Sequence, residues 1–69
     1  MKRHPVPSSN VASVGYDPDS QTLEVEFLHS GVYQYFDVPS SVYEEFMRAG
    51  SVGQYLDQNI KGRYRYAKV

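Results

Sequence analysis

Three segments in the first half of the chain have the residue pattern of β-strands. Residues 22–27 (TLEVEF) alternate strictly between apolar and polar side chains, which is typical of a strand with one buried and one wet face. Residues 11–16 are rich in β-branched and aromatic side chains, and residues 32–38 contain the densest aromatic run. Only short turns separate the three segments, so the pattern predicts a three-stranded antiparallel meander.

The residues between these segments have the chemistry of tight turns. In the tetrapeptide 17–20 (DPDS), Asp17 can accept a hydrogen bond from the backbone two residues later, and the proline presets φ for a type I turn. Gly31 can adopt the positive φ that a second reversal needs. Pro39 cannot donate to a ladder and therefore ends the third strand.

The third segment carries aromatic rings on both of its faces. Tyr33 and Tyr35 share one face, and Phe36 lies on the other. This distribution predicts a central strand whose tyrosine rings are half-buried while their hydroxyls reach water.

Two short helices are predicted after Pro39. Ser41 with Glu44, and Ser51 with Gln54, have the spacing of capping boxes at the two helix starts. Gly50 is expected to end the first helix in a left-handed conformation, and Gly62 to end the second. The apolar stripes at helical spacing are Val42, Phe46 and Ala49 in the first helix, and Val52, Tyr55, Leu56 and Ile60 in the second.

The predicted fold class is α+β, with the meander followed by two short helices packed on one face. Residues 63–66 alternate basic and aromatic side chains and either add a short C-terminal strand or form an ordered tail. Residues 1–10 have two prolines and no apolar period, so they are expected to form a flexible N-terminal arm. Residues 11–66 then make one domain, and residues 67–69 a tail.

Composition restricts how such a small domain is stabilised and where it resides. The 69 residues include no cysteine but seven tyrosines and three phenylalanines, so aromatic packing must supply most of the core. No apolar run is long enough to cross a bilayer. The basic start of the chain lacks the apolar stretch of a signal peptide. We therefore expect a cytoplasmic protein without a membrane partner.

Charge is distributed unevenly along the sequence. The net charge is −1, yet residues 1–10 and 60–69 together carry six of the seven basic residues and no acid. All eight acidic residues and the remaining base, Arg48, lie between these segments. This asymmetry indicates either a polar partner at the termini or charge complementarity within the molecule.

The sequence offers no set of residues suited to catalysis or metal binding. His4 lies in the expected arm and His29 in a predicted turn, where surface exposure is the simpler interpretation. Glu44 and Glu45 lie about 100° apart around a helix, and therefore do not form a catalytic pair. No ligand spacing for a metal is present. We expect no enzymatic activity, no cofactor and no metal.

The C-terminal segment is the strongest candidate for a binding site. Lys61, Arg63 and Arg65 can neutralise phosphates, while Tyr64 or Tyr66 can stack on an unpaired base. The competing interpretation is structural, because a thin core also needs aromatic rings to close its edge. The leading hypothesis is a nucleic-acid-binding site made of these five residues, with RNA as the partner.

A second hypothesis places the site on the predicted sheet. An aromatic patch around Tyr16, Tyr33 and Tyr35 would make the domain a protein–protein interaction module. Here too the structural interpretation competes, since a half-buried tyrosine with a wet hydroxyl is ordinary core behaviour.

The ordered set of short motifs resembles the KTSC domain, a small module found alone in bacterial and phage proteins and at the C-terminus of some lysyl-tRNA synthetases. The resemblance covers residues 8–66. It rests on the segments 13–17 (SVGYD), 33–35 (YQY), 38–43 (VPSSVY), 51–55 (SVGQY), 59–60 (NI) and 64–66 (YRY). It implies a domain without an established activity, for which RNA binding is suggested by its occurrence in a tRNA synthetase. The chain departs from the pattern at Arg65, where proline is common, and near Asp57, where basic residues are common.

Overall fold

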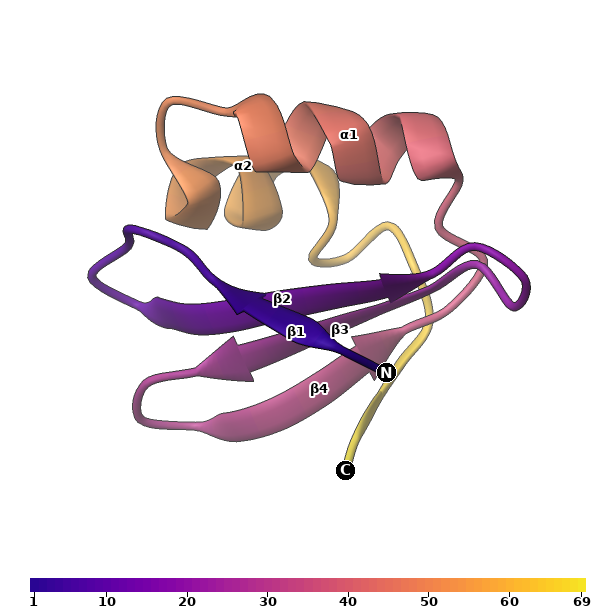
Figure 1. Ribbon diagram of the computed structural model, residues 1–69, viewed down its shortest axis with the longest axis horizontal. Coiled ribbons are helices and arrows are strands. Elements are labelled where there is room, and N and C mark those ends of the chain that lie inside the picture. Colours follow the sequence, from indigo (N-terminus) through magenta and orange to yellow (C-terminus); the bar gives the residue numbers. More distant parts are fainter.

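The computed structural model describes all 69 residues. It has a five-stranded antiparallel sheet with two helices over one face (Figure 1). The elements in chain order are β1 (Arg3–Pro5), β2 (Val11–Asp17), β3 (Thr22–Phe27), β4 (Gly31–Tyr35), α1 (Ser40–Arg48), α2 (Val52–Asn59) and β5 (Tyr66–Lys68). The strands lie in the order β1-β2-β3-β4-β5, so the chain returns from the helices to pair with β4. The α+β class is confirmed.

Four strands precede the helices, so the predicted count of three is wrong. The additional strand, β1, lies within residues 1–10, the expected flexible arm, and pairs with β2 from Arg3↔Gly15 to Pro5↔Ser13. An edge strand whose residues are largely exposed needs no alternating apolar pattern, and proline is tolerated there because one side of the strand has no partner. Periodicity alone therefore gave no signal for β1.

The central strands follow the predicted pattern closely. β2 and β3 begin at the predicted residues, and β4 lies between β3 and β5 as expected of a central strand. β4 ends at Tyr35 rather than Val38, because Asp37 takes a φ of +59° and turns the chain out of the sheet. The Val38 amide then donates to the Gln21 carbonyl (2.9 Å) in the β2–β3 turn.

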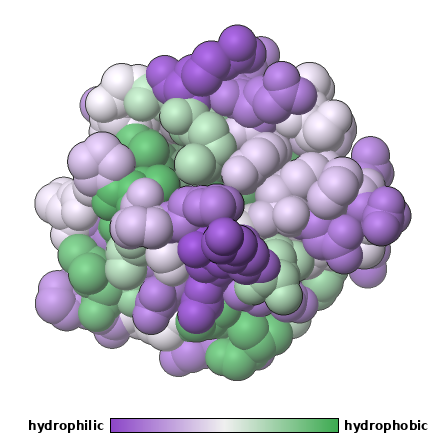
Figure 2. All heavy atoms as spheres, viewed as in Figure 1, coloured by the Kyte–Doolittle hydropathy of each residue, from purple (hydrophilic) through white to green (hydrophobic).

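The hydrophobic core lies between the sheet and the helices. Opposite residues in an antiparallel pair share a face, and the register Leu23↔Tyr35 and Val25↔Tyr33 places both tyrosines on the helix-covered face. The ten buried apolar residues are Val11, Val14, Leu23, Val25, Tyr35, Val38, Phe46, Val52, Leu56 and Ile60. On this view of the surface, hydrophobic residues form small separate patches, and strongly hydrophilic ones gather over β1 and along the helices (Figure 2).

The helix ends differ from each other in how their polar groups are satisfied. Ser51 caps α2 as predicted, its hydroxyl accepting from the Gln54 amide (3.3 Å). The capping box at Ser41 is absent, because the N-cap of α1 is Pro39, two residues earlier, and its carbonyl accepts from the Val42 amide (3.0 Å). Gly50 is not left-handed either, since α1 ends at Arg48 and the capping residue Ala49 is already in extended backbone.

Two other glycines do take the positive φ expected of them. Gly31 has a φ of +85° in the β3–β4 turn, and Gly62 has a φ of +80° shortly after α2. Neither helix is long and apolar enough to span a membrane.

Candidate functional site

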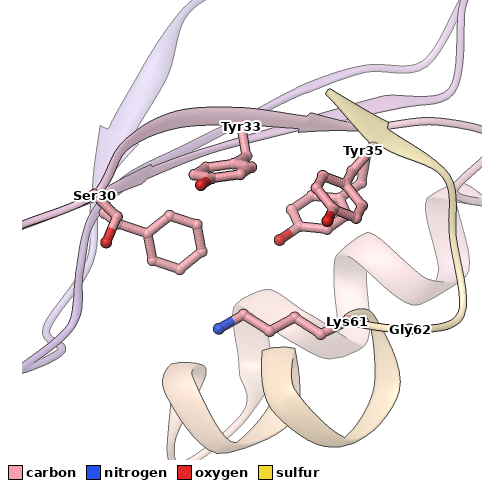
Figure 3. Close-up of a pocket in the computed structure, with 7 residues that line it drawn as sticks. Ser30, Tyr33, Tyr35, Lys61 and Gly62 are labelled. Atoms are coloured by element: carbon pink, nitrogen blue, oxygen red, sulfur yellow. The ribbon is translucent and has the colours of Figure 1, made fainter. Parts of the chain in front are cut away.

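A pocket opens between the end of the sheet formed by β3, β4 and β5 and the chain that leaves α2 (Figure 3). Its volume is about 390 Å³, which falls within the range of about 300–1,000 Å³ usual for ligand sites. We call it the aromatic pocket. Its lining residues are Phe27, Ser30, Tyr33, Tyr35, Lys61, Gly62 and Tyr66.

Four aromatic rings wall the pocket at steep mutual angles. Phe27 meets Tyr33 edge-on, with ring centroids 5.5 Å apart and an interplanar angle of 84°. Tyr66 lies 5.9 Å from Tyr33 at 46° and 5.8 Å from Tyr35 at 39°. No two of these rings are stacked face to face, and Tyr66 is the one that is largely exposed, so its ring is the one accessible to another planar group.

Two lysine ammonium groups lie over these rings. Lys61 extends beneath Tyr33 and Tyr35 with its amine directed into the pocket (Figure 3), and its Nζ is 5.1 Å from the Phe27 ring centroid. Lys68, from β5, places its Nζ 5.9 Å from the Tyr33 centroid. Lys61 also forms an exposed ion pair with Asp57 (3.2 Å), whereas no carboxylate lies within 4 Å of Lys68.

The segment after α2 forms a second, shallower hollow beside the pocket. The hollow is lined by Phe36, Gly62, Arg63, Tyr64, Arg65 and Tyr66. Arg65 lies 5.8 Å from the Phe36 ring centroid and pairs with Asp37 (3.0 Å). Arg63 donates from Nε to the Gln58 carbonyl (3.4 Å). The two hollows share Gly62 and Tyr66 and therefore form one continuous surface.

All five residues of the predicted nucleic-acid site lie on this continuous surface. Lys61 and Tyr66 line the aromatic pocket, while Arg63, Tyr64 and Arg65 line the adjoining hollow. Tyr66 has 61% of its surface exposed, so its ring is accessible, whereas Tyr64 is half-buried against the core. The structural interpretation therefore fits Tyr64 better than Tyr66.

The three tyrosines of the protein-binding hypothesis do not form one exposed patch. Tyr35 is 3% exposed and belongs to the core, and Tyr33 is half-buried in the aromatic pocket. Tyr16 instead stacks on Tyr43 of α1, with centroids 4.6 Å apart and planes at 9°. Its hydroxyl donates to the Val38 carbonyl.

Burial raises the pKa of two of these tyrosines above the ordinary value of 10.0. For Tyr35 the largest cause is desolvation, and negative charge on its neighbours, Asp57 among them, adds to the rise in pKa. For Tyr16 desolvation again comes first, followed by the charge of Asp17, which also raises the pKa. Both phenols are therefore neutral at physiological pH and serve as packing and hydrogen-bonding groups.

The structure adds Phe27, Ser30 and Lys68 to the residues that the sequence singled out. Phe27 is expected on the inner face of its strand. Because it is the last residue of β3, it lies at the pocket. Lys68 lay in the expected tail, and only its register with Tyr33 brings it here. His4 and His29 are exposed, as expected. No group of three or more potential metal ligands lies together.

Comparison with known proteins gives consistent matches. The sequence profile of the KTSC domain matches residues 7–64. An uncharacterised protein of Stutzerimonas stutzeri is 41% identical over the whole chain and 99% of its own length. A lysine–tRNA ligase of a Nostoc species is 41% identical over 88% of the chain, but this match spans only 11% of the ligase.

A solved structure agrees with the fold as well as the sequence. The crystal structure of a KTSC domain protein from Yersinia pestis has a TM-score of 0.97 and 44% identity, covering 99% of this chain and 96% of that one. Because the profile covers most of the chain and relatives match it over nearly full length, this protein belongs to the KTSC domain family.

Proposed function

We propose that this protein is a non-enzymatic module that binds single-stranded RNA through residues 61–68 and the aromatic pocket. The observation that supports this most directly is the continuous surface on which the exposed ring of Tyr66 and the half-buried rings of Tyr33 and Tyr64 lie among basic side chains. Basic side chains follow a phosphate backbone, and aromatic rings stack on unpaired bases whatever their identity.

The charge balance of this surface favours weak, salt-sensitive binding. Lys61, Arg63, Arg65 and Lys68 supply four positive charges, and the ion pairs with Asp57 and Asp37 offset two of them. Two to four phosphate contacts on a single strand give a slope of about −1.4 to −2.8 in log K against log salt. A steeper dependence would need basic residues that this surface does not have.

The relatives named lysine–tRNA ligase support an RNA partner. In those proteins the matching segment is about a tenth of the chain, so the ligase activity itself does not transfer to this small domain. What the relationship suggests is that the domain contacts an RNA such as tRNA.

The test is an NMR titration of the ¹⁵N-labelled protein with a short single-stranded RNA and with tRNA, at low and moderate salt. Saturable amide shifts that cluster on residues 61–68 and weaken as salt rises would support the proposal. If neither RNA shifts these amides at low salt, RNA binding is excluded. Pull-down experiments would then look for a protein partner, for which salt has little effect.

A pair of matched variants locates the binding surface. Arg63→Gln removes a basic residue that has no carboxylate partner, and should reduce the salt slope by about 0.7. Arg48→Gln makes the same change on α1, at a residue that does not line the surface, and should leave the slope unchanged. Equal effects of the two variants would mean that only overall charge matters.

A further inference from the structure

We infer that the aromatic pocket is a subsite for a single nucleotide, holding one unpaired base among its rings with a phosphate on Lys61 or Lys68. This inference rests on the proposed RNA-binding function and deepens it. The basic segment alone would contact the backbone of any RNA, whereas the pocket would bind one base of it.

The geometry of the rings favours a planar guest. Tyr66, Tyr35, Tyr33 and Phe27 are joined pairwise at angles of 39°, 46° and 84°. By contrast, Tyr16 and Tyr43 cover each other's faces at 9°. The pocket rings do not cover one another in this way, and the exposed Tyr66 ring can stack on a base.

The charges at the pocket select an anionic guest. An aromatic cage for a cation such as a methylated amine needs ring faces free of other positive charges. Here the ammonium groups of Lys61 and Lys68 already lie over Phe27 and Tyr33. A cationic guest would be repelled, whereas a phosphate beside the base would be attracted to both lysines.

Lys68 is held beside the pocket by the backbone of the β3–β4 turn. A Cβ on Gly31 would lie 3.3 Å from the Lys68 Cε, so the lysine stem lies directly against this glycine. The pairing of Tyr33 with Lys68 fixes the same strand register. The fold therefore places the stem of Lys68 beside the pocket, where its ammonium group can reach a phosphate.

Size and polar lining suit one nucleotide. A volume of about 390 Å³ lies near the lower end of the range for ligand sites, which fits a base with its sugar better than a run of bases. The hydroxyls of Ser30, Tyr33 and Tyr66 can each donate or accept, as the edge of a base requires. Beyond the shared Tyr66, Arg63 and Arg65 lie where neighbouring phosphates would follow.

The test uses the full chain with adenosine 5′-monophosphate, adenosine and inorganic phosphate as separate probes in NMR titrations. We expect the nucleotide to shift the amides of Phe27, Tyr33 and Tyr66 in a saturable way, adenosine to bind more weakly, and phosphate alone to leave the rings unaffected. If phosphate reproduces the nucleotide shifts, the site binds anions only and the inference is wrong.

Variants of the two key contacts complete the test. Tyr66→Ala should weaken nucleotide binding by at least about fivefold, whereas Tyr66→Phe keeps the ring and should bind like the wild type. Lys61→Gln should also weaken binding, with Lys2→Gln at the distant N-terminus as the control. Unchanged amide shifts of β4 would show that Tyr66→Ala leaves the sheet intact.

Failure of this inference is distinguishable from failure of RNA binding. If an RNA oligonucleotide binds residues 61–68 equally well in wild type, Tyr66→Ala and Lys61→Gln, the subsite is overturned, whereas RNA binding through Arg63, Arg65 and Lys68 stands. If no RNA binds at all, both fall.

Discussion

At the residue scale, Tyr16 links three parts of the molecule through one side chain. It projects from β2, stacks on Tyr43 of α1, and donates its hydroxyl to the Val38 carbonyl between sheet and helix. Removing the hydroxyl would leave this carbonyl without its donor. Tyr16→Phe should therefore lower the free energy of unfolding by about 0.5–1.5 kcal/mol in chemical denaturation.

Tyr55→Phe is the matched control for this change. The Tyr55 hydroxyl donates to the Glu45 carboxylate (2.8 Å), which is exposed and can bind water instead. We expect its loss to cost less than the loss of the Tyr16 hydroxyl. Equal losses in the free energy of unfolding for the two variants would mean that burial of the accepting oxygen does not determine how much each hydrogen bond contributes.

Asp57 is a second residue whose substitution has a predicted effect, in this case on the affinity for RNA. Its carboxylate pairs with Lys61 at the mouth of the aromatic pocket and competes with any phosphate there. Both side chains are largely exposed, so Asp57→Asn should change stability little. On the proposed function, Asp57→Asn should strengthen RNA binding at low salt in a fluorescence-anisotropy titration. Weaker or unchanged binding would show that Lys61 does not contact phosphate.

At the element scale, the two helix starts provide a direct comparison of caps. Ser51 accepts from the Gln54 amide at the start of α2, whereas Ser41 lies inside α1 and makes no cap. Ser51→Ala should cost about 0.5–2 kcal/mol in the free energy of unfolding. Ser41→Ala should be neutral or slightly stabilising, because alanine is the better helix former. A larger loss for Ser41→Ala in thermal unfolding would contradict the assignment of α1.

The pairing of β1 depends on Gly15 of β2. A Cβ on Gly15 would lie 2.7 Å from the Lys2 carbonyl oxygen, closer than backbone atoms tolerate. Gly15→Ala should therefore displace β1 and lower the free energy of unfolding by about 1–3 kcal/mol. Faster hydrogen exchange at the β1 amides would report the displacement.

A truncated background separates this clash from other effects of the alanine. In a chain without residues 1–5 the clashing backbone is gone, so Gly15→Ala should be harmless there or improve the strand. An equal loss of stability in both backgrounds would mean that β1 is not the cause.

Elements that bury a face were predictable, and elements that do not were less so. The alternation of residues 22–27 predicts β3 with the bounds that the structure shows, Thr22–Phe27. β1 is largely exposed and so carries no alternation, and its composition therefore predicts an arm and not a strand. The start of α1 differs from the prediction because its N-cap is Pro39, which has no side-chain acceptor, so the pattern of a capping serine does not mark it.

At the scale of the whole molecule, the sequence predicts the C-terminal segment of the candidate surface but not the residues from the sheet that complete it. Lys61 and Tyr66 stand in a sequence that alternates basic and aromatic residues, which is a local signal. The pocket they line also needs Phe27 and Tyr33, which are more than 25 positions away. These residues meet only because β5 returns to pair with β4, and a three-residue strand has no pattern that fixes its register.

The folded molecule as a whole should lose stability at alkaline pH, because three of its tyrosines hold their protons more tightly than they do in the unfolded chain. Burial raises the pKa of Tyr16, Tyr35 and Tyr55 above 10.0, and for Tyr55 the hydrogen bond to Glu45 contributes as well. In the unfolded chain these phenols return to their ordinary pKa of about 10, so above this pH the folded state binds more protons. The contribution of these tyrosines to the free energy of unfolding should therefore be constant below about pH 9 and decrease as the pH rises through 10.

Denaturant unfolding measured at several pH values between neutrality and pH 11 tests this expectation, with absorbance of the phenolate as a parallel signal. Tyr35→Phe removes the most deeply buried of the three phenols and should make the decrease with pH shallower than in the wild type, whatever its effect on stability at neutral pH. Other groups, such as lysines, titrate in the same range, but they are identical in the two proteins and cancel in the difference. If both proteins lose stability with the same pH dependence, Tyr35 titrates in the folded state as it does in the unfolded chain, and its burial does not hold its proton.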